Sequence, residues 1–388
     1  MLVTDFDAPT GGVQKNSRLL LSEFNDRGIK TYACVRNYYD RARNETVNGT
    51  EIYRTAVVGS SMTLNGILYM VGTFLWLMRN RNKFDVMHCQ QAFGPTMVAV
   101  VAGCFIRKPI LTRITLSGPT GEAAAIRQLP FAWIRLRLIR RVDRWVVLTK
   151  EMKREIVALG IPAKRITVIH NAAEMPVECR FEAETRQKYQ TELRLNGTKL
   201  AVFTGRLSQE KCIDVLIRAW KDVILSFPGA QLLILGEGGD YRNVETELKE
   251  LVETLGLLQN VAFLGHVNNT KDYLLASDAF VLPSNAEGMS NSLVEAFACG
   301  CCIIATDIPS NREICGDNLN SLLFTAGDTL GLSDLLRTVF ENPERASILG
   351  KAARAFAEER LTLERMVDQY LECYSAIMGN KTDKAATA

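Results

Sequence analysis

Short apolar segments alternate with longer helical stretches along this chain, and the alternation runs through two successive series. Apolar runs of this length between helices are typical of parallel strands in βαβ units. The first series of expected strands comprises residues 1–4, 31–35, 86–88, 110–115, 145–148 and 166–169. The second series comprises residues 200–204, 231–235, 261–264, 279–282 and 302–305. The pattern predicts an α/β protein with two doubly wound domains of similar size.

The segment that separates the two series is polar and charged. Residues 172–197 are rich in Glu, Arg and Gln, so we expect a linker and an entry helix there, with the domain junction at its start. This division gives an N-terminal domain over residues 1–172 and a C-terminal domain over residues 173–359. After Pro343 we expect the chain to be helical to about Met378.

The composition is that of an ordinary globular protein. Hydrophobic residues make up 47% and charged residues 23% of the 388, which excludes disordered and coiled-coil proteins. The ten cysteines are too sparse for a disulfide scaffold, and Cys299, Cys301 and Cys302 have no histidine beside them for a zinc site. We therefore expect reduced thiols in a cytoplasmic protein without a signal peptide. The most apolar run, residues 66–78, is too short to span a bilayer and is predicted to form a buried helix.

The net charge of +3 conceals two halves of opposite sign. Residues 1–180 hold 26 Lys and Arg and 14 Asp and Glu, a net charge of +12. Residues 181–388 hold 20 and 29, a net charge of −9. This asymmetry suggests two domains that face different partners. We expect no nucleic-acid partner, and an anionic acceptor or membrane surface beside the basic half.

Two glycine-containing loops follow expected strands and offer groups that suit a phosphate. Gly11 and Gly12 precede a helix whose N-terminus favours an anion, although a simple tight turn would also explain them. Arg206 and Lys211 lie five residues apart after the strand at 200–204. A planar guanidinium and an ammonium at a strand-to-helix junction suit a diphosphate. The alternative is a solvated loop with surface charges.

The most informative stretch follows the fourth strand of the second series. Ser290 or Asn291 can cap a helix that carries Glu295, and Glu287 would lie on the loop above the helix N-terminus. The backbone N–H groups of residues 289–293 would face the same space. Two carboxylates for hydroxyl groups and backbone donors for an anion would then lie together. Each carboxylate alone could also be a simple partner of the helix dipole.

A basic helix is expected at residues 131–145. At 100° per residue its apolar side chains fall on one face, and the opposite face carries Trp133, Arg137, Arg140, Arg141 and Arg144. The default interpretation is a core-packed helix with a solvated basic face. The alternative is a surface that docks on anionic lipid, with the tryptophan at the interface.

Together these features resemble the retaining, nucleotide-sugar-dependent glycosyltransferases of family 4, which have the GT-B fold. The resemblance covers essentially the whole chain and is strongest from Leu200 to Thr306. There the family's elements occur in order: Gly205-Arg206-Leu207 with Glu210-Lys211, Gly236-Glu237-Gly238, Phe263-Leu264-Gly265, Ser277-Asp278, Glu287-x7-Glu295 and Ala298-Cys299-Gly300. It implies two Rossmann-like domains that face each other across a cleft. It also implies a C-terminal helix, about residues 360–378, that packs back on the first domain.

The resemblance implies a role for each residue of these motifs. Arg206 and Lys211 would hold the donor diphosphate and stabilise the leaving nucleotide, Glu287 would contact the donor sugar, and Glu295 would bind the ribose hydroxyls. Arg206, Lys211 and Glu287 are the catalytic candidates. The other donor-binding candidates are Gly12, Glu237, Gly288, Met289, Ser290, Asn291 and Leu293. No metal and no other cofactor is implied.

One position departs from the family's pattern. Many relatives have a histidine after the strand at 110–115, where this chain has Ser117, so we assign no catalytic histidine and treat Ser117 as an acceptor-side candidate. The implied donor is a UDP-sugar first, with GDP- and ADP-sugars as alternatives, and the implied acceptor is a saccharide or a lipid-linked hydroxyl. Polysaccharide or glycolipid synthesis, peripheral on the inner face of the cell membrane, would follow. The rival functions are a non-catalytic nucleotide-sugar-binding protein and an epimerase or phosphorylase of the same fold.

Overall fold

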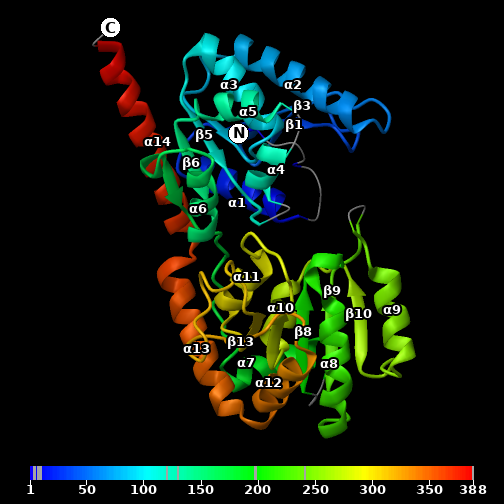
Figure 1. Cartoon of the computed structure of the whole chain (residues 1–388). Coiled ribbons are helices and arrows are strands. Elements are labelled where there is room, and N and C mark those ends of the chain that lie inside the picture. The colour runs from blue at the N-terminus through cyan, green and yellow to red at the C-terminus, as the bar shows by residue number, and fades with distance from the viewer. Residues whose placement is uncertain are drawn as a thin grey trace. The chain divides into compact units, whose positions relative to one another are not determined.

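The chain folds into two compact α/β units, shown as a computed structural model in Figure 1. The structure describes residues 1–2, 6, 11–118, 121–128, 131–195, 199–239 and 242–386, with side chains to residue 379. Unit 1 comprises Met1–Asn171 and Leu363–Ala388, and unit 2 comprises Ala172–Thr362. Both contain parallel sheets with helices against them, so the prediction of two Rossmann-like domains is confirmed.

Unit 1 is built on parallel strands that run β4-β5-β6-β7 and on a smaller sheet ordered β1-β3-β2. Leu2 joins the two sheets, because it forms parallel bridges to Cys34 on one side and to Cys89 on the other. Residues 3 and 4 of the expected strand at 1–4 lie outside the described residues. The strands are β1 (Tyr32–Arg36), β2 (Asn44–Val47), β3 (Thr50–Thr55), β4 (Met87–Cys89), β5 (Ile110–Arg113), β6 (Arg144–Val147) and β7 (Ile166–Val168).

The sequence interpretation missed one feature of this unit, the hairpin of β2 and β3. The two strands pair antiparallel, and Asn48 and Gly49 between them both have positive φ, 45° and 80°. An Asn-Gly pair is the preferred residue pair of a tight hairpin turn, so the signal was present in the sequence.

The helices of unit 1 cover its sheets, and one of them, α14, is the C-terminal helix of the chain. Helix α14 packs against α1, where the rings of Phe24 and Tyr374 lie 5.7 Å apart and Arg27 pairs with Asp368. The Tyr374 hydroxyl also shares a 2.6 Å hydrogen bond with Nδ1 of His88. The helices are α1 (Gly12–Asp26), α2 (Met62–Arg79), α3 (Gly94–Ile106), α4 (Glu122–Gln128), α5 (Ala132–Ile139), α6 (Lys150–Ala158) and α14 (Leu363–Ala386).

Two expectations about the helices of unit 1 are wrong. The run at 66–78 belongs to α2, which exposes apolar side chains along one side and is therefore not a buried helix. Helix α5 ends at Ile139 and does not continue to residue 145. The backbone N–H of Asp143 donates to the carbonyl of Ile110, and the N–H of Ile110 donates to the Asp143 carboxylate. Because these bonds hold residue 143 beside strand β5, the chain continues as strand β6 and not as a helix.

Unit 2 contains one six-stranded parallel sheet in the order β10-β9-β8-β11-β12-β13. The chain proceeds outward from β8 to β10, then returns to lie on the other side of β8 and proceeds to β13. The point where the order reverses therefore lies between β8 and β11, and in such sheets ligands bind beyond the carboxyl ends of the strands at that point. The strands are β8 (Leu200–Thr204), β9 (Gln231–Leu235), β10 (Val261–Gly265), β11 (Ala279–Leu282), β12 (Ile303–Thr306) and β13 (Leu322–Phe324).

The local sequence explains the elements of unit 2. Strands β8, β11 and β12 are buried at every position, as expected for continuous apolar runs in a sheet covered on both faces. Helix α11 begins after Ser290 and ends at Gly300, whose φ of 69° suits glycine. The helices are α7 (Ala183–Glu192), α8 (Ile213–Ser226), α9 (Glu245–Thr254), α10 (Thr270–Ala276), α11 (Asn291–Cys299), α12 (Thr329–Glu341) and α13 (Pro343–Arg360).

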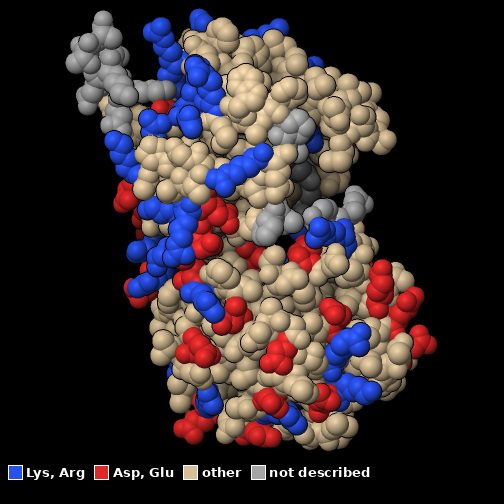
Figure 2. Space-filling view, in the orientation of Figure 1, with Lys and Arg blue, Asp and Glu red and all other residues tan. Residues whose placement is uncertain are grey.

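The surfaces of the two units differ in charge. In the face drawn in Figure 2, Lys and Arg account for most charged side chains of unit 1, whereas Asp and Glu gather over α9 of unit 2. Within the described residues, no helix combines the length and the apolar character that crossing a bilayer requires.

Candidate donor-binding site

The loops after β8 and β9 touch through their backbones at two glycines. Gly205 and Gly236 have φ values of 153° and 132°, and a Cβ atom on Gly236 would lie 1.9 Å from the carbonyl oxygen of Gly205. Only glycine fits such an approach. The contact fixes the start of the loop that carries Arg206 and Lys211, at the carboxyl end of the sheet.

Lys211 and Glu287 meet at the centre of the site. The Lys211 Nζ atom lies 2.5 Å from Oε1 of Glu287, and the two side chains are only 13% and 10% exposed. The backbone N–H of Asn285 donates to the carbonyl of Glu210 at 3.0 Å and so joins the same two loops. The structure thus brings together two residues that are 76 positions apart and that sequence analysis assigned to one site.

Arg206 is held more loosely than Lys211. Its side chain is about half exposed, and its nearest carboxylate, Glu210, is 3.8 Å away. The Ser208 hydroxyl donates to the same Glu210 carboxylate at 2.7 Å. Glu210 was not among the predicted site residues, although its spacing of four residues from Arg206 is that of an ion pair. Arg206 therefore keeps a guanidinium available to an anion, with Glu210 positioned to orient it.

The N-terminus of α11 provides the backbone part of the site. The Ser290 Oγ atom accepts a hydrogen bond from the N–H of Leu293 at 3.5 Å and shares a 2.8 Å contact with the Ser292 hydroxyl. Gly288, Met289 and Ser290 are buried ahead of the helix. Asn291 is the first helical residue and Glu295 lies one turn further on, partly buried. The arrangement places a helix N-terminus next to Glu287, as the sequence predicts.

The loop after β9 contributes a carboxylate that supports its neighbours. The Glu237 Oε1 atom accepts the N–H of His266 at 3.0 Å, and the Glu237 carbonyl accepts the N–H of Leu207 at 3.0 Å. These bonds join the loops after β8, β9 and β10 at one edge of the sheet. In the described structure Glu237 is therefore a residue that positions two adjacent loops.

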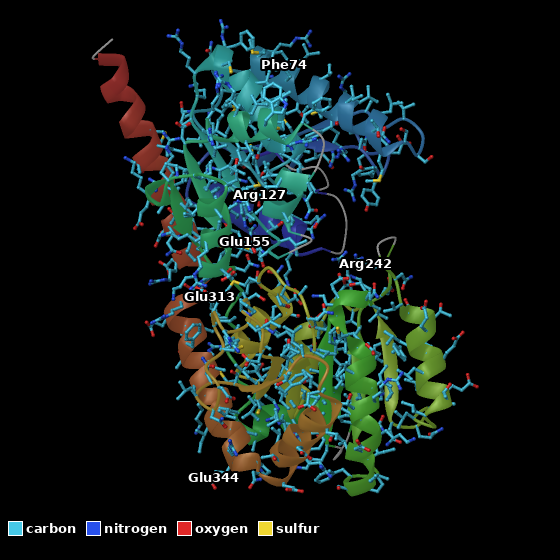
Figure 3. The ribbon with its side chains drawn as sticks, in the orientation of Figure 1. Phe74, Arg127, Glu155, Arg242, Glu313 and Glu344 are labelled. Atoms are coloured by element: carbon cyan, nitrogen blue, oxygen red, sulfur yellow. The ribbon has the colours of Figure 1, made fainter. Side chains whose placement is uncertain are left out.

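Of the candidates in unit 1, Gly12 lies at the start of a helix and Ser117 on a loop that follows a strand. Gly12 is the first residue of α1, and its carbonyl accepts from the Asn16 side chain. Ser117 lies in the loop after β5, which is held by the Glu155 carboxylate through the N–H of Gly118 at 2.8 Å. Burial raises the pKa of Glu155. Figure 3 shows Glu155 on α6 beside Arg127 of α4, which donates to the carbonyl of Ala158.

The basic residues expected on one helix face lie on three different segments. Arg137 is exposed on α5, and Arg140 and Arg141 are exposed after its end. The Arg141 guanidinium contacts the Cys104 sulfur at 2.6 Å. Arg144 belongs to β6 and donates to the carbonyl of Lys164, which makes it a structural residue and corrects its placement on the helix.

Eight of the ten cysteines are buried and act as packing residues. All ten are free, and burial raises the pKa of Cys301 and of Cys302 to about 12, so both remain thiols. Among the described residues no group of three His, Cys, Asp or Glu side chains is placed to hold a metal ion.

Two family models match this chain, and together they cover most of it. The model described as "Glycosyl transferases group 1" matches residues 185–356, and the "Glycosyl transferase 4-like domain" matches residues 11–172. The chain belongs to the family-4 type of glycosyltransferases. The first match contains Arg206, Lys211 and the Glu287–Glu295 pair, and the second ends at the boundary between the two units.

Individual relatives of this glycosyltransferase agree with that assignment. It is 24% identical over 302 residues to N-acetyl-alpha-D-glucosaminyl L-malate synthase of Bacillus anthracis, covering 77% of this chain and 76% of the relative. It is 30% identical over 215 residues, 55% of each chain, to a Campylobacter jejuni N-acetylgalactosaminyltransferase that acts on N-acetylgalactosamine-N,N'-diacetylbacillosaminyl-diphospho-undecaprenol. Its fold is similar to that of Anabaena HepE in complex with UDP-glucose, with a TM-score of 0.77, 18% identity and coverage of 97% and 98%.

Proposed function

We propose that this glycosyltransferase moves a sugar from a nucleoside diphosphate donor to an acceptor hydroxyl, with retention at the anomeric carbon and without a metal ion. The observation that carries the proposal is the Lys211–Glu287 pair beside Arg206, at the reversal point of the unit 2 sheet. A donor diphosphate would replace Glu287 as the partner of Lys211. Glu287 would then be available to the hydroxyl groups of the donor sugar.

The proposed chemistry depends on neutralising the charge that develops on the leaving group. As the bond from the anomeric carbon to the diphosphate oxygen breaks, negative charge grows on the diphosphate, and Arg206, Lys211 and the N-terminus of α11 stabilise it. These cations supply what a divalent metal supplies in other enzymes. The acceptor oxygen bonds to the anomeric carbon on the face that the diphosphate leaves, and its proton passes to a diphosphate oxygen.

The donor we favour is a UDP-sugar. The UDP-glucose complex of HepE supports this choice, since that protein has a similar fold. GDP- and ADP-sugars are the alternatives, and thermal shifts with UDP, GDP, ADP and their common sugars would distinguish them. A UDP-specific stabilisation is expected, and none with any of the nucleotides would contradict the assignment of the donor site.

The acceptor we favour is lipid-linked, as in the Campylobacter jejuni relative. The exposed cations Arg137, Arg140 and Arg141, with Trp133, suit an anionic membrane surface on unit 1. Ten free thiols support a reducing compartment, the cytoplasmic side of that membrane. Polysaccharide or glycolipid synthesis would be the setting. Ser117, on the loop after β5, is our acceptor-side candidate.

The decisive experiment replaces Lys211. We expect Lys211→Ala to lower kcat/KM for donor turnover by roughly 100- to 1,000-fold, as when one donor to a developing anion is removed. The matched control is Lys221→Ala, an exposed lysine on α8 of the same unit, which should leave turnover unchanged. Turnover by Lys211→Ala equal to that of the control would contradict the proposed role.

A broad acceptor panel separates this function from its rival. Donor hydrolysis or transfer by the wild-type chain, lost in Lys211→Ala, is expected. Donor binding by a folded wild-type chain, with no transfer or hydrolysis across the whole panel, would instead favour a non-catalytic nucleotide-sugar-binding protein.

A further inference from the structure

Helix α2 presents a row of apolar side chains to the outside of unit 1. Val71 and Leu75 are 52% and 46% exposed, and Leu64, Ile67 and Met70 are exposed with them. The opposite side of the helix is buried through Asn65, Tyr69, Thr73 and Leu77. Most surface helices place polar residues outward, so an apolar row on the outside indicates a surface that is covered by another partner.

The apolar row continues onto the neighbouring helix α3. Its side chains Val101 and Phe105 are exposed, the latter by 65%. The rings of Phe74 on α2 and Phe105 on α3 meet edge to face with centroids 6.1 Å apart. Figure 3 marks Phe74 where α2 lies beside α3. We call the exposed side chains Leu64, Ile67, Met70, Val71, Leu75, Val101 and Phe105, together with the half-buried Phe74, the α2–α3 face.

The charges of the chain segment that carries the α2–α3 face are almost all positive, and its Lys83 pairs with Glu51 of β3 at 3.6 Å. The segment from residue 62 to residue 141 holds 11 Lys and Arg but only 2 Asp and Glu. Of those two carboxylates, Asp85 pairs with Lys108 at 3.3 Å and Glu122 is buried. Over α2, Figure 2 shows a broad surface of uncharged side chains with no Asp or Glu in it. Among the exposed cations, Arg79 ends α2, Arg107 caps α3 and Arg141 contacts Cys104 of α3, so these arginines border the face. Arg81, Arg137 and Arg140 are exposed in the same segment.

We propose that the α2–α3 face embeds in the surface layer of an anionic lipid bilayer, with the bordering arginines on the lipid phosphates. An apolar stripe bordered by cations is what an interfacial helix needs. Trp133, 69% exposed, lies on α5, a helix packed against α3, and an exposed tryptophan suits the bilayer interface. This inference rests on the proposed function, because it names the surface on which that lipid-linked acceptor would lie.

Charge decides between a bilayer and a second copy of this chain. In a two-fold dimer the same patch lies on both subunits, so the bordering arginines would face one another and repel. Anionic lipid headgroups instead neutralise them, while the acyl region accepts the apolar row. The positive border thus favours the bilayer, and self-association becomes an alternative outcome of the test.

The test is vesicle co-sedimentation of the full chain without donor or acceptor. We expect binding to vesicles of phosphatidylcholine mixed with phosphatidylglycerol. Val71→Glu combined with Leu75→Glu should weaken vesicle binding at least about 100-fold, because two apolar side chains that would be buried in the bilayer are lost. Arg137→Gln combined with Arg141→Gln should weaken it roughly 25-fold, about fivefold per cation. High salt should act in the same direction as the arginine changes.

Matched controls lie on unit 2. Leu225→Glu with Leu330→Glu changes two exposed leucines of α8 and α12, and Arg218→Gln with Lys221→Gln changes two exposed cations of α8. Both controls should bind vesicles as the wild type does. Circular dichroism and thermal melting show that each variant folds, and substitution at exposed positions should preserve the fold.

Three results would overturn the proposal: no vesicle binding by the wild type, equal binding by Val71→Glu/Leu75→Glu, or wild-type self-association that these changes abolish without any vesicle binding. Failure of the proposed function has a different signature. If Lys211→Ala kept full donor turnover, the donor site would be wrong while vesicle binding could still stand. If vesicle binding failed, donor hydrolysis in solution would be unaffected.

Discussion

Each unit holds a largely buried carboxylate where a loop meets its parallel sheet, but the partners differ. In unit 2, Asp278 accepts the Arg180 and Arg186 guanidinium groups at 2.9 and 2.8 Å and the Leu200 N–H at 2.9 Å. In unit 1, Glu122 accepts only neutral groups in the bonds that hold it: the N–H of Ala92 at 2.6 Å and the N–H and hydroxyl of Thr115 at 2.8 and 2.9 Å.

This difference distinguishes an ionic support in unit 2 from a loop in unit 1 whose support depends on a titratable carboxyl group. Asp278 has two positive partners, and it ties the starts of β8 and β11 to α7, at the edge of the sheet opposite the loops of the candidate donor site. Glu122 has only N–H and O–H dipoles, which offset part of the cost of burial, so burial still raises its pKa. Glu122 ties the loops after β4 and β5, and the second of these carries Ser117. The support of the unit 2 sheet is therefore ionic, and we expect the support of the Ser117 loop in unit 1 to depend on pH.

The largest effect on stability should come from Asp278→Asn, which leaves two guanidinium groups without their carboxylate. Removing one partner of a buried ion pair costs about 3–5 kcal/mol, and since Asp278 is 13% exposed we expect about 3 kcal/mol. Urea unfolding measures the loss, and hydrogen exchange of the β8 amides should accelerate with it. The control is Asp334→Asn, which breaks an exposed pair with Arg337 and should cost under about 1 kcal/mol. Equal losses in the two variants would remove the distinction drawn for Asp278.

A smaller effect, with a defined pH dependence, is expected for Glu122→Gln. The glutamine presents an NH₂ group to the N–H of Ala92, and leaving that buried donor unpaired costs about 1–2 kcal/mol. Because the folded pKa of Glu122 is raised, its stabilising contribution is full below the unfolded pKa and is lost as the pH rises through the folded pKa. The free energies of unfolding of wild type and variant should therefore differ most in acid and converge toward neutral pH. A difference that grows as the pH rises would show that Glu122 is held as an anion, like Asp278.

The sequence predicted the strands and helices of both units but not the contacts of these carboxylates, since Asp278 stood out only as part of a family motif. Arg206, Lys211 and Glu287 were predicted together because the carboxyl ends of parallel strands meet at one edge of a sheet. Asp278 and its partner Arg180 are 98 positions apart, and no periodicity connects them. The exposure of α2 was missed for a related reason. Hydropathy shows that a helix is apolar on all sides, but it cannot show whether protein covers the outer side.

The smallest expected effect on stability comes from replacing a helix cap, and each unit offers one cap for comparison. Ser290 accepts the N–H of Leu293 at the start of α11, and Thr149 accepts the N–H of Met152 at 3.2 Å at the start of α6. Replacing either by alanine should lower the free energy of unfolding by about 1 kcal/mol. Only Ser290→Ala should also weaken UDP binding in calorimetry, because α11 points its N-terminus at the proposed diphosphate position. If Thr149→Ala weakened UDP binding as much, the effect would be one of general stability, and the N-terminus of α11 would lose its assigned role.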